Sequence, residues 1–323
     1  MLFTKRAALA ALAFAPLLAG LPAQAQNYPN QPIKFIIQAA AGGLPDTTAR
    51  IVARVLQERL GQSIVIENRP GANGSVAIAA MLSAPADGYS FVVSDGSILS
   101  INPVIYSKLA YNTADVVPAV MLARGPLFLA VNPKVPVNSL KELVDYAKSK
   151  PGELNYGSSG VGSTHHLSME ALSAALKIKM THVPFKGTGE SVPALLGGHI
   201  DLLFSAYPSL SGAIESKKVK ALATNGPQRS PQAPDAPPVA DLVPGFDFAP
   251  VIGLFARVGT PDAIIQKVAA EVAVVVKQPD VMKQFATAGI EPVGAGPAEY
   301  AKAMQAEIQR VNDTVKVAGI KPQ

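Results

Sequence analysis

The sequence predicts an α/β protein whose two lobes enclose a central ligand cleft. Short apolar runs alternate with amphipathic helical patterns along the chain, which favours parallel strands covered by helices. Two glycine-rich segments, 40–46 and 157–164, each join a strand-like run to a helix. Removing a predicted leader of 25 residues from the 323 leaves about 298, which is long for one small core and suits two lobes.

The first 25 residues have the pattern of a secretory signal peptide. Lys5 and Arg6 precede an apolar run over 7–21, and Ala23-Gln24-Ala25 is a small-x-small cleavage site. A membrane anchor is the alternative, but the run is shorter than the roughly 20 apolar residues that cross a bilayer. We expect cleavage after Ala25 and a periplasmic location. The chain has no cysteine, which excludes a lipid-anchored lipoprotein, a disulfide framework and Cys-ligated zinc.

The first half of the mature chain is expected to alternate strands and helices. The helix that begins near Asp46 carries its apolar residues on one face and has Gly61 at its stop position. A turn-rich loop is expected at 70–74 and a turn at Asp87-Gly88. The predicted strands are 33–37, 63–67 and 90–93, and the predicted helices are 47–60 and 75–83.

The second half repeats this alternation. Residues 117–131 are expected to be extended. Two extended segments, near 124–131 and 250–256, predict the two crossovers of a hinge, and the prolines between 226 and 245 predict a loop. Ser139 is the predicted cap of the helix that follows it. The predicted strands are 154–157, 180–183, 201–205 and 220–223. The predicted helices are 139–149, 163–176, 189–197, 261–288 and 297–318.

Both glycine-rich segments are predicted anion sites. A strand that breaks at Gly42-Gly43 and restarts as a helix leaves unpaired backbone N–H groups at the positive end of the helix dipole. The segment from Gly157 to Thr164 repeats this arrangement about a hundred residues later. Two such loops predict a ligand held between two lobes.

Several other chemistries are excluded or disfavoured. Ser163 stands where a phosphate loop needs lysine, and Val161 stands where a nucleophile elbow needs glycine. His165 and His166 are adjacent, so they cannot form the i, i+4 ligand pair of a zinc site, and we assign them a polar or capping role. The formal charge of +5 falls to about +3 without Lys5 and Arg6, and the basic residues are dispersed, which disfavours nucleic-acid binding. No cofactor or metal is predicted.

The chain resembles the Bug/TctC family of extracytoplasmic receptors for tripartite tricarboxylate transporters. The resemblance covers nearly the whole mature chain, and it rests on the order of motifs that are individually weak. These motifs are Tyr28-Pro29-x-x-Pro32-Ile33, Ala41-Gly42-Gly43-x-x-Asp46, Glu67-Asn68-Arg69-Pro70-Gly71-Ala72, Asp87-Gly88-Tyr89, Ile101-Asn102-Pro103, Gly157-Ser158-x-Gly160-x-Gly162, His182-Val183-Pro184-Phe185-Lys186-Gly187, Leu196-Gly197-Gly198-His199-Ile200-Asp201, Arg229-Ser230-Pro231 and Ala318-Gly319-Ile320-Lys321-Pro322.

The resemblance implies a type II periplasmic-binding-protein fold with two hinge crossovers. Lobe 1 is expected to comprise 26–124 and 225–323, and lobe 2 to comprise 125–224. It implies a monomer that binds a small organic acid, such as a di- or tricarboxylate, an acidic amino acid or an aromatic acid, and delivers it to integral membrane subunits. The ligand-binding residues expected from the loops, the resemblance and their surroundings are Ala41, Gly42, Gly43, Asp46, Ser94, Asp95, Arg124, Ser158, Ser159, Ser163, Thr164, Phe185 and Tyr207.

The roles of four of these residues have alternatives. Ser158 and Thr164 either contact the ligand or make turn and cap bonds. Phe185 and Tyr207 either form a specificity wall or pack in the core. 

Three positions depart from the family pattern. Ala41 replaces the usual proline, and Gln38 stands where an apolar residue or proline is commoner. Arg124 stands where small or apolar residues are usual. It either pairs with a second ligand carboxylate or makes a surface or interlobe ion pair.

The sequence therefore predicts a non-catalytic receptor for a small carboxylate. A secreted hydrolase that uses the 157–164 loop is one alternative, although the loop holds no complete catalytic motif. A receptor that feeds a sensor instead of a transporter is the other, and both receptors would use the same closed state.

Overall fold

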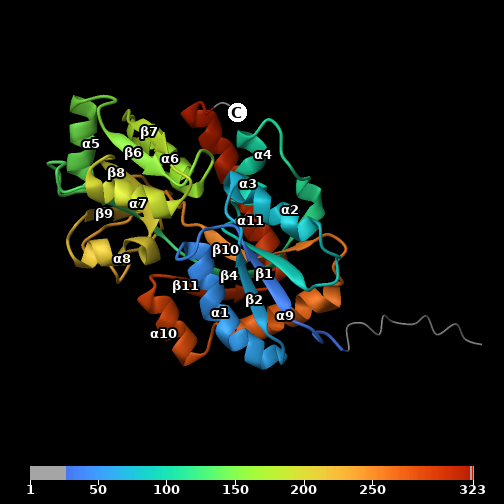
Figure 1. The fold of residues 1–323 in the computed structure, drawn as a ribbon. Helices are drawn as coiled ribbons and strands as arrows, with labels where there is room; N and C mark the ends of the chain where they lie inside the picture. The colour runs from blue at the N-terminus through green and yellow to red at the C-terminus, as the bar shows by residue number, and fades with distance from the viewer. Residues whose placement is uncertain (1–26, 321, 323) are drawn as a thin grey trace, which may run out of the picture.

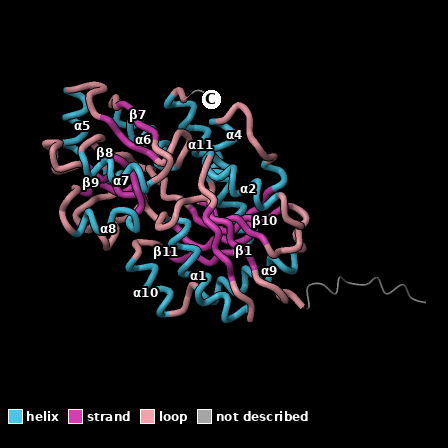
Figure 2. The backbone as a smooth tube through the Cα atoms, in the orientation of Figure 1, coloured by secondary structure: helices cyan, strands magenta, loops and turns pink. Residues whose placement is uncertain are grey.

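The structure is a computed structural model that describes residues 27–320 and 322, and it contains two β-sheets flanked by helices (Figure 1). The strands gather in two separate groups (Figure 2). The first sheet has six strands in the order β11-β4-β10-β3-β1-β2, and the second has five in the order β7-β6-β8-β5-β9. The predicted mixed α/β fold with two sheets is confirmed. The predicted signal peptide lies outside the described residues.

The first sheet is mixed. β1 pairs in parallel with β2 and β3, and β10 runs antiparallel to both β3 and β4. Its strands are β1 (Ile33–Ile37), β2 (Ile64–Asn68), β3 (Ser90–Ser94), β4 (Val116–Arg124), β10 (Val251–Arg257) and β11 (Glu291–Ala295). Its helices are α1 (Leu44–Leu60), α2 (Ser75–Leu82), α3 (Ser97–Ser100), α4 (Asn102–Ile105), α9 (Asp262–Val275), α10 (Pro279–Thr287) and α11 (Pro297–Ala318). Short 3-10 turns lie at Ala72–Gly74, Thr113–Asp115 and Val239–Asp241.

The second sheet is built in the same way. β6 is parallel to β7 and β8, and β5 is antiparallel to β8 and β9. Its strands are β5 (Leu127–Val131), β6 (Asn155–Ser158), β7 (Thr181–Pro184), β8 (Leu202–Ala206) and β9 (Lys220–Thr224). Its helices are α5 (Leu140–Ser149), α6 (Thr164–Leu176), α7 (Thr188–Gly197) and α8 (Tyr207–Glu215).

The chain passes between the sheets twice, from β4 to β5 and from β9 to β10. Buried Asn225 ties the two crossings together, since its Oδ1 accepts from the Leu127 amide at 2.7 Å and its Nδ2 donates to the Phe248 carbonyl at 2.8 Å. The Gly125 amide also donates to the Pro250 carbonyl at 3.2 Å. These bonds define a compact hinge region beside the space between the lobes.

Local sequence signals explain several element ends. Gly61 adopts a left-handed φ of 68° and ends α1, and Ser139 caps α5 by accepting from the Glu142 amide. Both features were predicted. The start of α1 was placed near Asp46, but the helix begins at Leu44, because Pro45 is tolerated in the first helical turn.

Three predictions of secondary structure were incomplete. The helix predicted over 261–288 is two helices, because Pro279 cannot continue α9 and instead opens α10. The helix α8 and the edge strand β11 were not predicted. β11 is short, contains Pro292 and is only partly buried, so its sequence carries little strand pattern.

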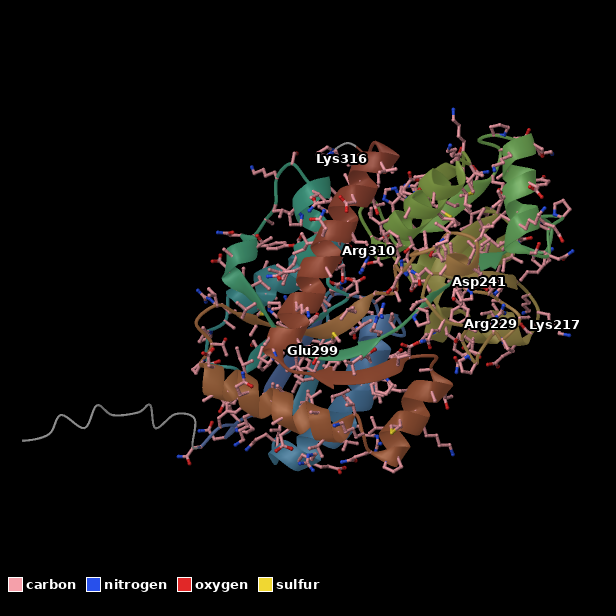
Figure 3. The ribbon with its side chains drawn as sticks, turned by 180° about the vertical axis from the view of Figure 1, so that it is seen from behind. Lys217, Arg229, Asp241, Glu299, Arg310 and Lys316 are labelled. Carbon is pink, nitrogen blue, oxygen red and sulfur yellow. The ribbon has the colours of Figure 1, made fainter. Side chains whose placement is uncertain are left out.

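The C-terminal helix α11 lies along the back of the molecule, where Glu299, Arg310 and Lys316 mark its course (Figure 3). It packs against both α3 and α6, so it touches elements of both lobes. Among the described residues, the structure contains no helix with the length and apolar character needed to cross a membrane.

Candidate functional site: a cavity between the two lobes

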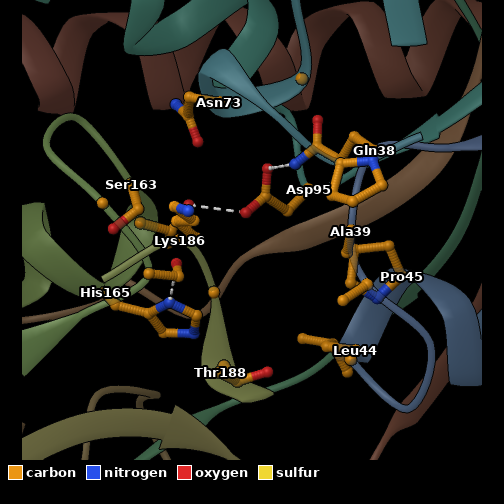
Figure 4. A pocket seen from close by; sticks show the side chains of 18 of the residues that line it. Gln38, Ala39, Leu44, Pro45, Asn73, Asp95, Ser163, His165, Lys186 and Thr188 are labelled. Atoms are coloured by element: carbon orange, nitrogen blue, oxygen red, sulfur yellow. Dashed lines mark hydrogen bonds between the residues drawn. The ribbon is translucent and has the colours of Figure 1, made fainter. Parts of the chain in front are cut away.

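A cavity of about 430 Å³ lies between the two sheets (Figure 4). Its lining includes the residues that directly follow four strands and the last residue of a fifth. These are Gln38 after β1, Asp95 after β3, Ser159 after β6 and Phe185 after β7, with Ala206 as the last residue of β8. Parallel strands end at one edge of a sheet, and ligands of open α/β sheets bind outside that edge. The fold therefore places the cavity where such proteins bind ligands.

Four helices begin at the cavity. Their first N–H groups have no intrahelical acceptor and carry the positive end of the helix dipole. This convergence favours an anionic ligand. The lining residues at these helix starts are Gly43, Leu44 and Pro45 for α1, Ser163, Thr164 and His165 for α6, Gly187 and Thr188 for α7, and Ala206 and Ser209 for α8.

The loop before α6 combines a turn with a helix cap. Ser158 is buried, and its Oγ lies 2.7 Å from Nε2 of His182 and accepts from the Gly160 amide at 3.1 Å. Ser158 does not line the cavity, so the structure gives it the turn role. Ser163 caps α6 by accepting from the His166 amide at 3.2 Å, and it also lines the cavity.

The loop before α1 is held by Asp46. The Asp46 carboxylate accepts from the Gly42 amide at 2.9 Å, from Nδ2 of Asn68 at 2.9 Å and from Nε of Arg50 at 3.0 Å. Although burial opposes ionisation, the bonds from Arg50, Gly42 and Asn68 lower the pKa of Asp46. Asp46, Ala41 and Gly42 lie outside the lining, whereas Gly43 is part of it. Asp46 thus supports the loop from behind.

Asp95 is a charged residue of the lining. Its Oδ1 accepts from Nε2 of Gln38 at 2.5 Å and from the hydroxyl of Ser97 at 2.7 Å. Its Oδ2 accepts from Oγ1 of Thr164 at 2.8 Å. Since Asp95 follows β3 in the first sheet and Thr164 opens α6 in the second lobe, this bond crosses the cavity mouth.

Two more hydrogen bonds join the lobes. Nδ2 of Asn73 donates to the Gly162 carbonyl at 2.7 Å, and the hydroxyl of Tyr106 donates to the Val161 carbonyl at 2.9 Å. These three bonds all end on the 161–164 segment of lobe 2. The structure therefore shows the lobes in contact over this segment.

The histidines near the cavity are neutral around pH 7. His182 stacks between Tyr156 and His166, with centroid separations of 4.8 Å to the Tyr156 ring and 4.1 Å to the His166 imidazole. Burial lowers the pKa of His166 to about 3 and that of His182 to about 4. His165 lines the cavity and its Nδ1 bonds the Ser159 hydroxyl, and burial lowers its pKa to about 4.

The remaining predicted residues are divided between the cavity and other contacts. Phe185 lines the cavity. Ser94 is fully buried and accepts from the Gly96 amide, and Tyr207 donates to Glu215. Arg124 pairs with both carboxylate oxygens of Asp247, at 2.8 and 2.9 Å, so the structure shows its ion-pair alternative.

Several lining residues were not predicted. Lys186 lies inside a motif that supported the family resemblance, and Asn73 and Tyr106 follow two others, so those motifs were the signal available. His165 was assigned only a polar or capping role. The complete set of unpredicted polar and larger apolar lining residues is Gln38, Leu44, Asn73, Tyr106, Leu127, Val161, His165, Lys186, Thr188 and Ser209.

Comparison with known proteins agrees with this architecture. The family model of the tripartite tricarboxylate transporter family receptor matches residues 48–320. A solved structure of R. palustris Rpa4515 with adipate is 32% identical, with a TM-score of 0.87, and the match covers 92% of this chain and all of that one. MatC from Rhodopseudomonas palustris with bound malate is 32% identical, with a TM-score of 0.80, and the match covers 89% of this chain and 100% of that one. The periplasmic binding protein BugD is 28% identical, with a TM-score of 0.84, covering 92% and 100%.

The fold and its cavity define a two-lobe solute-binding protein. The chain belongs to the tripartite tricarboxylate transporter receptor family, because the family model spans most of its length.

Proposed function

We propose that this protein is a periplasmic, monomeric receptor that captures a small carboxylate and delivers it to the membrane subunits of a tripartite tricarboxylate-type transporter. The ligand carboxylate binds at the start of α6, on Ser159, Ser163 and Thr164, and the loop of α1 that includes Gly43 faces it from lobe 1. Closure occurs about the two crossings, with lobe boundaries at 124/125 and 224/225.

The observation that carries this proposal is the convergence of four helix starts on one cavity between two sheets. Hydroxyls and backbone amides bind a carboxylate without a buried countercharge, and charge-assisted bonds of this kind are stronger than neutral ones. Two similar proteins with solved structures contain carboxylates, adipate and malate. The family assignment supports the membrane partner and the periplasmic location.

A thermal-shift screen of mono-, di-, tri- and aromatic carboxylates tests the proposal. A ligand at 100 times its Kd adds about 2.7 kcal/mol of stability. Ser159→Ala removes one hydroxyl of the site, and we expect Kd to rise about tenfold or more, as for a hydrogen bond to a charged group. The matched control is Ser149→Ala at the exposed end of α5. A screen in which no carboxylate raises the melting temperature contradicts the proposal.

The Ser159–His165 hydrogen bond favours one alternative, a secreted hydrolase. In the part of the chain that the structure describes, no carboxylate hydrogen-bonds to His165. A pKa of about 4 also makes this imidazole a weak base. Ester hydrolysis that is lost in Ser159→Ala would support the enzyme, whereas carboxylate binding without turnover supports the receptor.

A further inference from the structure

We propose that the ligand is an α-amino acid with an apolar side chain, and that Asp95 binds its ammonium group. This inference rests on the proposed carboxylate receptor and names its ligand class. It starts from the unusual position of Asp95, which places a carboxylate in a cavity whose helix starts favour an anion.

The negative charge of Asp95 has only neutral partners. The Ser97 amide and hydroxyl and Nε2 of Gln38 occupy Oδ1, while Thr164 alone donates to Oδ2. Oδ1 therefore accepts three hydrogen bonds and Oδ2 accepts one from the described residues, so Oδ2 retains acceptor capacity. Within the described residues, no ion pair includes Asp95. A ligand cation is therefore the natural countercharge.

The short distance between Asp95 and the proposed carboxylate site determines how far the ligand cation can lie from the ligand carboxylate. Oγ1 of Thr164 lies 2.8 Å from Oδ2 of Asp95, so the start of α6 and the Asp95 carboxylate are side by side. A simple carboxylate bound to α6 would lie next to a second negative charge and be repelled. An α-amino acid avoids this repulsion, because its ammonium is one carbon away from its carboxylate and can lie between the two anions.

The other lining residues match a zwitterion with an apolar body. Asp95 and exposed Lys186 are the charged side chains of the described lining, so the cavity carries no net charge. Leu44 and Pro45 lie on the same side of the cavity as Asp95 but at a distance from it (Figure 4), and Phe185 also lines the cavity. These walls suit a branched or aromatic side chain.

Gln38 gives this arrangement its rigidity. Gln38 is 9% exposed. Its Nε2 donates to Oδ1 of Asp95 and fixes the carboxylate, so that Oδ2 faces lobe 2. Gln38 thus orients Asp95.

The test compares ligands that differ by one group. Calorimetry measures the binding of L-leucine, 4-methylpentanoate and 3-methylbutylamine, together with the aromatic pair L-phenylalanine and 3-phenylpropanoate. We expect the wild-type protein to bind at least one amino acid roughly 30-fold or more tightly than its desamino acid, which is the effect expected of a buried charge pair on Kd. We expect no measurable binding of 3-methylbutylamine. This comparison needs no variant, so it stands even if a substitution disturbs folding.

Asp95→Asn provides the second arm, with Asp145→Asn on exposed α5 as the matched control. The amide keeps an acceptor but loses the charge, so we expect amino-acid binding to weaken and desamino-acid binding to strengthen. Equal or tighter wild-type binding of the desamino acids overturns the inference, as does an equal loss for both ligands in Asp95→Asn. If some carboxylate raises the melting temperature but neither amino acid binds, the amino-acid inference is overturned and the proposed carboxylate receptor stands. If no carboxylate raises the melting temperature, the proposed receptor function is overturned as well.

Discussion

Glu307 on α11 is a buried acid directly behind the loop that carries Asp95. It is 8% exposed, and its Oε1 accepts from the Ser100 hydroxyl at 2.6 Å. Its Oε2 has no hydrogen-bond partner in the described structure. Burial raises the pKa of Glu307 to about 7, the Asp95 charge adds to this, and the Ser100 bond and two arginines oppose it. Replacing Glu307 by glutamine removes the titration and keeps the shape.

The sign of the effect follows from the raised pKa. Between pH 4.5 and about 7 the folded protein holds a proton that the unfolded chain has released, so wild-type stability from this group is full below pH 4.5 and falls as pH rises through 7. A shift of this size is worth roughly 3 kcal/mol. Glu307→Gln does not titrate. We therefore expect its stability relative to wild type to increase by about 2–3 kcal/mol between pH 5 and pH 8.

Urea unfolding at pH 5 and pH 8 measures this difference. The chain contains no tryptophan, so far-UV circular dichroism is the suitable signal. Equal m values in the two proteins make their midpoints comparable. Subtracting the unfolding free energy of wild type from that of the variant at each pH cancels the contributions of the other titrating groups. These include the buried histidines, whose lowered pKa values make the protein less stable as pH falls.

Glu299→Gln is the matched control, since Glu299 is an exposed residue of the same helix (Figure 3). We expect its stability relative to wild type to be the same at both pH values. If the Glu307→Gln difference also stays constant between pH 5 and pH 8, then burial does not raise the pKa of Glu307 and the reasoning is refuted.

Two further substitutions test the lobe contact and the first sheet. Tyr106→Phe deletes the hydrogen bond to the Val161 carbonyl across the lobes. We expect the ligand Kd to rise about fivefold, while the melting temperature of the ligand-free protein stays within about a degree of wild type. An unchanged Kd in calorimetry would disprove the contribution of this bond to closure. Gly253→Ala puts a Cβ 2.4 Å from the ring of Tyr300 and 2.5 Å from the Val120 carbonyl, so urea unfolding should show a loss of about 3 kcal/mol or more. A loss below 1 kcal/mol would show that the strand can shift at little cost.

The sequence was sufficient for elements whose signals are local. Gly61 and Ser139 mark the end and the start of their helices through their own backbone or side chain, and both were predicted. The break at Pro279 was also visible in the sequence, but a continuous apolar pattern over 261–288 outweighed it. α8 begins at a Tyr-Pro pair directly after a buried strand and has no polar N-cap residue, so the usual sequence signal of a helix start is missing.

The site was predicted less completely because its contacts join distant segments. Ser159, Ser163 and Thr164 were predicted because they share one loop, and they line the cavity, as does Asp95. Arg124 was left with two alternatives because its partner, Asp247, is 123 residues away.

Two aspartates at similar positions show why the three-dimensional partners decide the chemistry. Asp46 and Asp95 both lie near the carboxyl end of a first-sheet strand, close to the start of a helix. Asp46 is neutralised by Arg50 and directed away from the cavity, so it leaves the field of α1 available to an anion. Among the described residues, the hydrogen-bond partners of the Asp95 carboxylate beside α6 are neutral. A receptor for simple carboxylates would be expected to pair Asp95 with a basic side chain, as Asp46 is paired with Arg50. The lack of such a pair among the described residues favours a ligand that carries a cationic group.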